Sequence, residues 1–395
     1  MTAPEPPLDG EAARLLRLIG AHARPTGSAA ESAARRVCAE WLAEAGFDVE
    51  EPAFTYSAWP GTWGTLAVGL ALLLNATILL INISRGTSAG HAVAWALCAL
   101  VPIVVGAWWL GRYGTRKLPF LRRSGVNLEA RRRLPEAGAN TGVNVWLVAH
   151  LDSKSQPMSL LLRSAASIAA GAAWIGLAVA LGPLAVYAAS PGFAIVLAAC
   201  AAIAAVPLLF SRPGTEGAGA LDNASGVASI VLAARRIDQA GMVGVVLTSA
   251  EEFGLAGARA WVEGRMKGVA INCDGVDDRG KVSITAGFRG RELIGRVRKG
   301  VFLGPEVRIR RSLPGILLDA TAFSDRGWAA CTISQGTLGS LARVHTRGDT
   351  LDSLTGAGVE RTAAVIASLA GAIIAGEGPT ANGKEIRNPH GTATP

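Results

Sequence analysis

The chain has 395 residues, of which 50% are hydrophobic and 17% charged, and its mean hydropathy is +0.34. An average soluble domain has about a quarter of its residues charged, and here the apolar residues are concentrated in a few long runs without charge. The composition therefore argues against an entirely soluble protein and is typical of a chain that spans a membrane.

The net charge of +8 is compatible with a nucleic-acid partner or with an anionic lipid partner. The basic residues crowd beside the apolar runs, and no nucleic-acid recognition motif accompanies them; they are Arg112, Arg116, Lys117, Arg122, Arg123 and residues 131–133. This juxtamembrane pattern favours the lipid bilayer as a partner and disfavours nucleic acid.

The cysteines and the first residues bear on the compartment. The five cysteines are scattered and form no C-x-x-C pair, which indicates no disulfide framework and fits a reducing cytoplasm. The opening segment MTAPEPPLDGEAARLL contains acidic residues and no apolar core, so it does not match a secretory signal peptide.

Two amphipathic helices are predicted in the N-terminal segment. The first takes its apolar face from residues 15–19, and the second runs from about Glu31 to Ala45 with Val37, Trp41 and Leu42 on one stripe.

Four charge-free stretches are each long enough to cross a hydrocarbon core of roughly 30 Å, which needs about 20 helical residues. They pair into two hairpins and cover about Gly64–Ile83, His91–Leu110, Ser164–Leu181 and Gly192–Phe210. The alternative, buried helices of a soluble core, is disfavoured because such lengths carry no charged residue. The sequence therefore predicts four inserted transmembrane helices.

The ten lysines and arginines between Arg112 and Arg163 place this middle segment in the cytoplasm by the positive-inside rule. Each hairpin returns the chain to the side that it left, so the segments outside the hairpins share one compartment and can assemble one domain. We therefore expect an integral protein of the cell membrane whose polar domain is cytoplasmic.

Apolar runs alternate with helical stretches in the rest of the chain. The runs are Val143–Ala149, Val243–Thr248, Val269–Cys273 and Ala329–Ser334, and the helical stretches lie near Gly226–Gln239 and Leu255–Glu263. The alternation predicts an α/β fold with a mixed twisted sheet flanked by helices. Most of the polar clusters fall at the carboxyl end of a predicted strand, where open α/β sheets build their sites.

The predicted organisation is therefore one interrupted domain. Residues 1–57, 112–157 and 212–380 form it, the hairpins occupy residues 58–111 and 158–211, and residues 381–395 are expected to be a disordered tail.

Clusters of metal-ligand residue types recur along these segments: His150-x-Asp152, Asp222-Asn223, Glu251-Glu252, Asp274, and His345 with Asp349. Each is ordinary alone, because acidic pairs are common in solvated turns and an aspartate after a strand often caps a helix. Imidazole and carboxylate groups brought together at strand ends can hold two divalent ions. The joint pattern therefore predicts a metal centre.

The combination of motifs resembles the co-catalytic zinc aminopeptidases of metallopeptidase family 28. The stretches that carry the resemblance are VAHLDS (148–153), GALDNASGVA (219–228), SAEEFGLAGA (249–258), NCDG (272–275) and HTRGDT (345–350). The N-terminal segment from RPTGS to FDVE and LLDATAF (317–323) also look like the family, although a histidine common after that aspartate is Ala320 here. The resemblance covers nearly all of the chain outside the hairpins.

The resemblance implies two zinc ions, although cobalt or manganese suits the same ligands. His150 and Asp274 would bind one ion, Glu252 and His345 would bind the other, and Asp222 would bridge the two.

The resemblance also implies catalytic roles for residues beside the ligands. Glu251 would be the general base, Asp152 would orient His150, and Asp349 would orient His345. The family often places a tyrosine near the final histidine to stabilise the oxyanion; none lies there in this sequence, and Arg343 is a candidate substitute.

The expected activity is hydrolysis of the N-terminal peptide bond of a peptide with a free N-terminus. Glutaminyl cyclisation with one zinc ion on the same scaffold is an alternative, which the full ligand set and the Glu251-Glu252 pair disfavour. A catalytically inactive membrane scaffold would show degenerate ligands, and a transporter would place polar residues inside the spans.

The second hairpin lies between Asp152 and Asp222, with only about ten residues from each motif to the nearest span. At about 3.3 Å per extended residue, the metal centre must lie within a few tens of Å of the bilayer. A hydrophobic or membrane-associated peptide is the substrate that this suggests, and a simple anchor is the alternative.

Overall fold

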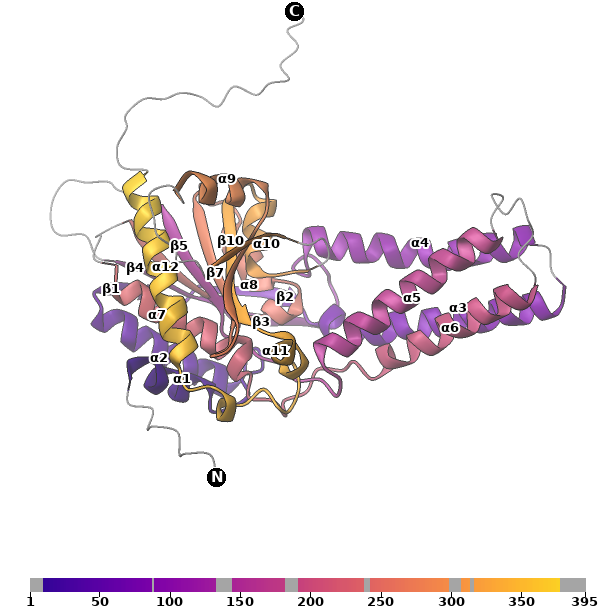
Figure 1. Ribbon diagram of the computed structural model, residues 1–395, viewed down its shortest axis with the longest axis horizontal. Helices are drawn as coiled ribbons and strands as arrows, with labels where there is room; N and C mark the ends of the chain where they lie inside the picture. The colour runs from indigo at the N-terminus through magenta and orange to yellow at the C-terminus, as the bar shows by residue number, and fades with distance from the viewer. Residues whose placement is uncertain are drawn as a thin grey trace, which may run out of the picture.

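The computed structural model describes residues 10–86, 89–132, 144–181, 191–237, 242–297, 307–312 and 316–376. In this part of the chain, a layered α/β domain carries a group of long helices that projects from one side of it (Figure 1). The predicted tail at residues 381–395 lies outside the described residues.

Within the described residues, an eight-stranded mixed sheet with the order β1-β4-β6-β5-β7-β10-β8-β9 forms the centre of the domain. Its middle strands run parallel and are β6 (Val243–Thr248), β5 (Val145–His150), β7 (Val269–Val276) and β10 (Ala329–Gly336). The outer strands are β1 (Phe47–Glu50), β4 (Leu128–Arg132), β8 (Lys281–Ala286) and β9 (Arg308–Arg311). The expected mixed sheet is confirmed, and its parallel strands end along one edge.

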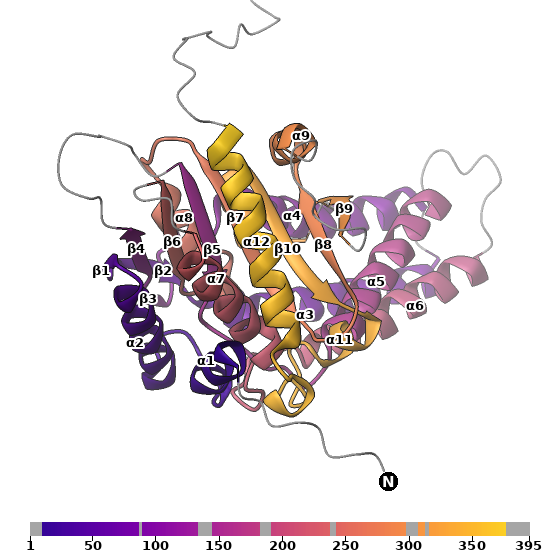
Figure 2. The ribbon, with the colours of Figure 1, turned by 60° about the vertical axis from the view of Figure 1, so that its left-hand side comes forward.

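One face of the sheet is covered by α1 (Glu11–Gly20), α2 (Ala29–Glu44), α7 (Ser225–Arg235), α9 (Phe288–Val297) and α12 (Ala357–Gly376). Figure 2 shows α7 and α12 side by side across this face. The main hydrophobic core lies beneath them, and α7 is buried from Ser225 to Ala234. A Cβ atom at Gly226 would lie 2.7 Å from the carbonyl oxygen of Cys273, so only glycine lets α7 approach β7 this closely.

The opposite face packs against α8 (Ala256–Val262) and α10 (Asp319–Asp325). An aromatic cluster fills this layer, with ring centroids 4.5 to 5.9 Å apart, and consists of Trp146, Trp261, Phe323 and Trp328. Both faces of the middle strands are therefore covered, which explains why those strands are continuous apolar runs.

The projecting helices are α3 (Thr65–Ser84), α4 (Ala89–Tyr113), α5 (Leu160–Leu181) and α6 (Pro191–Leu209). Small and apolar side chains such as Ala76, Ala173 and Ala201 fill the interior between them. Their outer surface is apolar as well: Leu74 is 62% exposed, and Ile168 is 72% exposed. An apolar surface of this extent is stable against lipid tails and unfavourable in water.

Each pair of projecting helices leaves and re-enters the domain at adjacent points. The first pair lies between β2 (Ala53–Ser57) and β3 (Arg122–Val126), which form a two-stranded antiparallel sheet. The second pair is closed at its base by Ser155 and Gly214, which exchange two backbone hydrogen bonds with N···O distances of 3.0 and 2.6 Å. The inserted helices therefore interrupt the sequence of the domain without separating its parts in space.

The predicted number of four membrane spans is not matched. By length and composition, the helices of the described residues that could cross a membrane are Pro60–Ser84, Leu160–Leu177 and Ala357–Ala375. The first two coincide with predicted spans. The third is α12, and half of its apolar stretch is buried against the rest of the domain. The apolar part of α6, Ile195–Leu209, is shorter than a span.

The sequence predicted the parallel strands in the middle of the main sheet and missed the strands outside them. The predicted runs at 143–149, 243–248, 269–273 and 329–334 correspond to β5, β6, β7 and β10. Strands β3 (RRSGV), β4 (LEARR) and β9 (RIRR) lie outside the parallel middle of the main sheet, contain charged side chains and form no continuous apolar run.

If the projecting helices cross the membrane, the end of α3 and the segment after α4 lie on opposite sides. Cysteines placed at the exposed positions Arg85 and Lys117, in a chain whose Cys98 and Cys200 are replaced by alanine, test this. A membrane-impermeant maleimide should label position 85 in intact cells and position 117 only after permeabilisation. Labelling of both positions from the same side would contradict the crossing.

Candidate metal centre

The predicted ligands lie at one edge of the sheet. His150 is the last residue of β5, Asp274 lies near the end of β7, and Glu252 belongs to the 3-10 turn Glu251–Phe253 that follows β6. Asp222 lies in the π-helical turn Ala220–Ala224 that leads into α7. His345 follows the short helix α11 (Leu338–Arg343), ahead of the 3-10 turn Leu351–Ser353.

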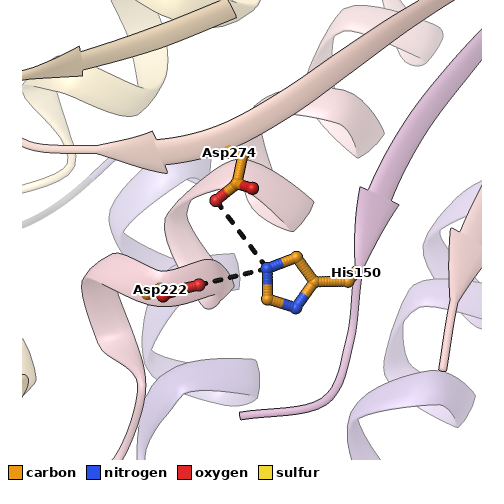
Figure 3. A group of neighbouring side chains, drawn as sticks. All are labelled: His150, Asp222 and Asp274. Carbon is orange, nitrogen blue, oxygen red and sulfur yellow. Dashed lines mark ion pairs between the residues drawn. The ribbon is translucent and has the colours of Figure 1, made fainter. Parts of the chain in front are cut away.

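His150 reaches from β5 towards two carboxylates. Its Nε2 atom lies 3.1 Å from Asp222 Oδ1 and 3.7 Å from Asp274 Oδ1 (Figure 3). The His150 side chain is 2% exposed, and those of the two aspartates are 12% and 13% exposed, so the group is nearly closed to solvent.

A second group lies next to the first and shares Asp222 with it. His345 Nε2 is 2.9 Å from Asp222 Oδ2 and 3.0 Å from Glu252 Oε1. Glu252 Oε1 is buried, and it makes no hydrogen bond of acceptable geometry to any described residue. The Glu252 oxygen and the His345 nitrogen are thus close together without a hydrogen bond of acceptable geometry between them. Two ligands of one metal ion would have this arrangement.

The ligand atoms in each group lie within 4.8 Å of one another. Bonds from a zinc-sized ion to imidazole nitrogen and carboxylate oxygen are about 2.0–2.2 Å, so either group can surround one ion. The structure thus brings the predicted ligands together as two adjacent candidate metal sites. Burial alone would raise the pKa of Asp222, but the hydrogen-bonded histidines on both sides hold that pKa well below its ordinary value.

Asp152 orients both His150 and the turn that carries Glu251. His150 Nδ1 lies 2.9 Å from the main-chain oxygen of Asp152 and 3.8 Å from its carboxylate. That carboxylate accepts hydrogen bonds from the backbone N–H groups of Glu251 and Glu252, at 3.1 and 3.4 Å, and from the Thr26 hydroxyl at 2.9 Å. Asp152 therefore contacts His150 through its main-chain oxygen, and its carboxylate contacts the turn that carries Glu251.

Asp349 does not contact the ring of His345, and the expectation that it orients this ring is corrected. Its carboxylate accepts hydrogen bonds from the backbone N–H groups of Leu221 at 2.6 Å and Asp222 at 3.1 Å. Asp349 therefore positions the shared ligand Asp222. The His345 Nδ1 atom instead faces Arg163 Nη2 at 3.3 Å.

Asn223 connects the shared aspartate to the end of β7. Its Nδ2 donates to the carbonyl oxygen of Cys273 at 3.0 Å, and its Oδ1 accepts from the backbone N–H of Gly275 at 3.2 Å. These bonds fall on both sides of Asp274, so the separation of Asp222 and Asp274 is set by one buried amide.

Arg24 joins the loops on both sides of the second hairpin. Its buried guanidinium donates to the carbonyl oxygens of Leu151 at 2.9 Å, Ala218 at 3.0 Å and Gly219 at 2.8 Å, and to that of Ile19 at 2.9 Å. The first of these carbonyls follows the ligand His150, and the next two precede the ligand Asp222. Arg24 is therefore a positioning residue for ligands that are 72 residues apart in the numbering, 222 − 150.

Glu251 and Asp319 are buried carboxyl groups beside the ligands. Burial raises the pKa of Glu251 well above its ordinary value; neighbouring carboxylates add to this shift and His150 opposes it. Burial also raises the pKa of Asp319 to about 7. The Thr248 hydroxyl donates to Asp319 Oδ2, and Asp319 Oδ1 has no hydrogen-bond partner among the described residues.

Two cations lie against the second ligand group. Lys154 Nζ forms an ion pair with Glu252 Oε2, and Arg163 of α5 approaches His345. Arg343, the candidate substitute for an oxyanion-stabilising tyrosine, forms an ion pair with the buried Asp277. The described contacts thus place Lys154 and Arg163 at the ligands, and Arg343 at an aspartate that is not one of them.

Sequence reasoning missed several of these side chains. Arg24 and Asp319 lie in the matched segments RPTGS and LLDATAF, but nothing in a single sequence shows which main-chain atoms an arginine contacts. Lys154 and Arg163 had been counted only as part of a basic segment beside the membrane. Lys154 lies two residues after Asp152, which is a local signal for Lys154; Arg163 has no such signal.

The fold and the site together define an α/β protein with a candidate two-site metal centre at the carboxyl ends of parallel strands. A model of peptidase family M28 matches residues 134–370, which is more than half of the chain, and the chain belongs to this family. Comparison with curated proteins gave no match.

Solved structures share the fold at low sequence identity. A zinc aminopeptidase from Bacillus subtilis aligns at 10% identity over 92% of this chain and 94% of that chain, with a TM-score of 0.51. A Zn-dependent exopeptidase from Parabacteroides distasonis aligns at 14% identity over 94% and 99%, with a TM-score of 0.51. A glutaminyl cyclase from Porphyromonas gingivalis aligns at 14% identity over 92% and 98%, with a TM-score of 0.50. These likenesses support the fold and leave the reaction to be argued from the site.

Replacing Arg24 with lysine keeps the positive charge and removes the planar set of donors that joins the two loops. We expect the affinity for a divalent ion to fall about 10- to 100-fold, the range for residues that hold metal ligands in position. Competition with a chromophoric chelator measures this affinity. Arg35→Lys is the matched control, because Arg35 pairs with Glu51 and not with these loops; equal affinities in both variants would contradict the role of Arg24.

Proposed function

We propose that the chain is a two-zinc aminopeptidase that removes N-terminal residues from peptides at the cytoplasmic surface of the cell membrane. The observation that carries this proposal is the pair of ligand groups that share Asp222, with the Glu251 carboxyl beside them. Membership of peptidase family M28 supports peptide hydrolysis, and the zinc-named structural neighbours support zinc.

Glu251 is the residue that we assign to proton transfer. When bound, the ions would lower the pKa of a water molecule and polarise the scissile carbonyl group. A general base and acid works best with a pKa near the operating pH, and burial shifts the pKa of Glu251 in that direction. The hydrogen bond from the Glu251 backbone N–H to Asp152 fixes the turn that carries the carboxyl group.

Glutaminyl cyclisation is the alternative reaction on this scaffold. The likeness to the Porphyromonas gingivalis glutaminyl cyclase shows that the fold does not separate the two reactions. The ligand set favours hydrolysis, because residues suited to two ions are present, whereas the cyclisation that we considered uses one. A catalytically inactive scaffold is disfavoured, because the ligands and Glu251 are all retained.

The Glu251→Ala variant separates metal binding from proton transfer. We expect it to retain about two zinc ions per chain and to lose about 10²- to 10⁴-fold in kcat, the usual contribution of a general base. A panel of aminoacyl amides together with metal analysis measures both quantities. Glu263→Ala, at a partly exposed glutamate that pairs with Arg116, is the control. One ion per chain, or full activity in Glu251→Ala, would argue against the proposal.

The position of the centre bears on the substrate. Arg163 lies in the first turn of the candidate span α5 and approaches the ligand His345, and the Gln156 backbone N–H donates to the His345 carbonyl oxygen at 2.7 Å. The candidate metal centre is thus in contact with the base of the second hairpin, through His345. This supports a hydrophobic or membrane-associated peptide as substrate, and a plain anchoring role for the hairpin is the alternative.

A peptide carrying a lipid chain tests the role of the membrane. The protein reconstituted in vesicles should hydrolyse the vesicle-bound peptide with a lower KM than the same peptide without the lipid chain, because binding to the bilayer concentrates substrate near the centre. In detergent micelles that bind neither peptide, the two KM values should converge. Equal turnover of both peptides in vesicles would favour the anchoring role.

A further inference from the structure

Lys154 and Arg163 form a cationic pair on the Glu252–His345 side of the centre. The Lys154 side chain is 20% exposed, and its ammonium group contacts Glu252 Oε2. Arg163 is partly buried, and its Nη2 lies 3.3 Å from His345 Nδ1. Its Nε is buried and has no hydrogen-bond partner in the part of the chain that the structure describes. The pair therefore includes a hydrogen-bond donor, Arg163 Nε, that no described residue of the protein accepts from.

The contact between Arg163 and His345 cannot persist once the ring serves as a metal ligand through Nε2. A neutral imidazole that ligates through one nitrogen carries its N–H on the other, and a guanidinium group has donors only. Two donors would then face each other at Nδ1, and Arg163 needs a different acceptor. Gln156, on the same segment, donates its backbone N–H to the His345 carbonyl oxygen, and its side-chain Oε1 is a buried acceptor without a hydrogen-bond partner among the described residues.

The charges of the centre lead to the same requirement. The carboxylates of Asp222, Glu252 and Asp274 carry three negative charges, and two divalent ions would carry four positive charges. Lys154 and Arg163 then add two positive charges in a largely enclosed place. A cation that is shielded from water and has no anionic partner of its own is costly. Because Lys154 shares Glu252 with the candidate ions and Arg163 has no carboxylate partner among the described contacts, the site favours an anionic group from outside the protein.

We propose that Lys154 and Arg163 receive the terminal carboxylate of a dipeptide substrate, so that the enzyme is an aminopeptidase with a preference for dipeptides. This inference rests on the proposed aminopeptidase activity. In a dipeptide, the terminal carboxylate carbon lies one residue beyond the scissile carbonyl carbon, which is about 3.5 Å in an extended chain. Lys154 contacts the carboxylate of the candidate ligand Glu252. When the scissile carbonyl group is bound at the ions, the terminal carboxylate of a dipeptide is therefore within reach of Lys154.

The chemistry of the pair suits a carboxylate. A guanidinium group binds a carboxylate through paired hydrogen bonds, and an ammonium group supplies a compact charge beside it. A longer peptide has a neutral amide at the same position, which leaves both cations without a partner. The two cations therefore favour a dipeptide, which has a carboxylate next to the scissile bond, over a longer peptide, which has a neutral amide there.

Substrates that differ only in that charge test the proposal. The values of kcat/KM are compared for four substrates: leucyl-alanine, leucyl-alanine amide, leucyl-asparagine amide, and leucyl-aspartate α-amide, whose carboxylate is on the side chain. We expect the wild-type protein to prefer leucyl-alanine over both neutral substrates by at least about 10-fold. Arg163→Gln and Lys154→Met should each reduce this preference, and Arg163→Lys should restore part of it relative to Arg163→Gln.

A binding measurement gives a readout that does not depend on turnover. Calorimetry compares the Kd of a reduced-amide isostere of leucyl-alanine with that of its carboxamide, with metal content measured on the same samples. Arg163→Gln should weaken binding of the carboxylate form about 10-fold or more and bring the two Kd values together. Arg212→Gln is the matched control, because Arg212 follows the same hairpin and its guanidinium lies over the ring of Trp63.

The outcomes separate this inference from the proposed function. Equal kcat/KM for leucyl-alanine and its amide in the wild-type protein would overturn the carboxylate receptor while leaving the aminopeptidase in place. A higher kcat/KM for leucyl-aspartate amide than for leucyl-alanine would also overturn it, in favour of a side-chain carboxylate. No hydrolysis of any substrate by metal-loaded protein would overturn the proposed function, and the calorimetric comparison would still decide whether the pair binds a carboxylate.

Discussion

The arrangement of the candidate centre depends on the hydrogen bonds of one buried guanidinium. Arg24 donates to main-chain oxygens just after His150 and just before Asp222, and these two loops are separated in sequence by the second hairpin. Buried carbonyl oxygens without donors would each cost about 1–3 kcal/mol. The arginine therefore stabilises the loops against each other at the place where the chain is most interrupted, and Asp349 and Asn223 complete the support of Asp222 from the other sides.

The sequence predicted the middle of this molecule better than its edges. The runs that became β5, β6 and β7 are continuous and apolar because both of their faces are covered, and such runs are distinct from the rest of the chain. Strands β3 and β9 consist largely of arginine and small residues, and only their pairing with β2 and β8 makes them strands. Pairing with a distant segment leaves no local signal that a single sequence shows.

The candidate ligands were predictable and their supporting contacts were not. Each of the five ligands lies in a motif whose residue types and order are specific, and the structure brings all of them into two groups. Asp349 lies four residues from His345, but the fold turns its carboxylate towards the backbone of Asp222. The contacts of Lys154 and Arg163 are visible only in the fold, because their partners Glu252 and His345 are remote in sequence.

The order of the elements along the chain also constrains when the centre can form. Strand β5 precedes the second hairpin, and its neighbours β6 and β7 follow it, so the parallel core closes only after the last inserted helix has been synthesised. His345 comes later still, after β10 has joined the sheet. During synthesis from the N-terminus, both pairs of projecting helices are made before the set of candidate ligands is complete. The order of the elements therefore means that the chain can assemble both ligand groups of the candidate centre only after all four projecting helices have been made.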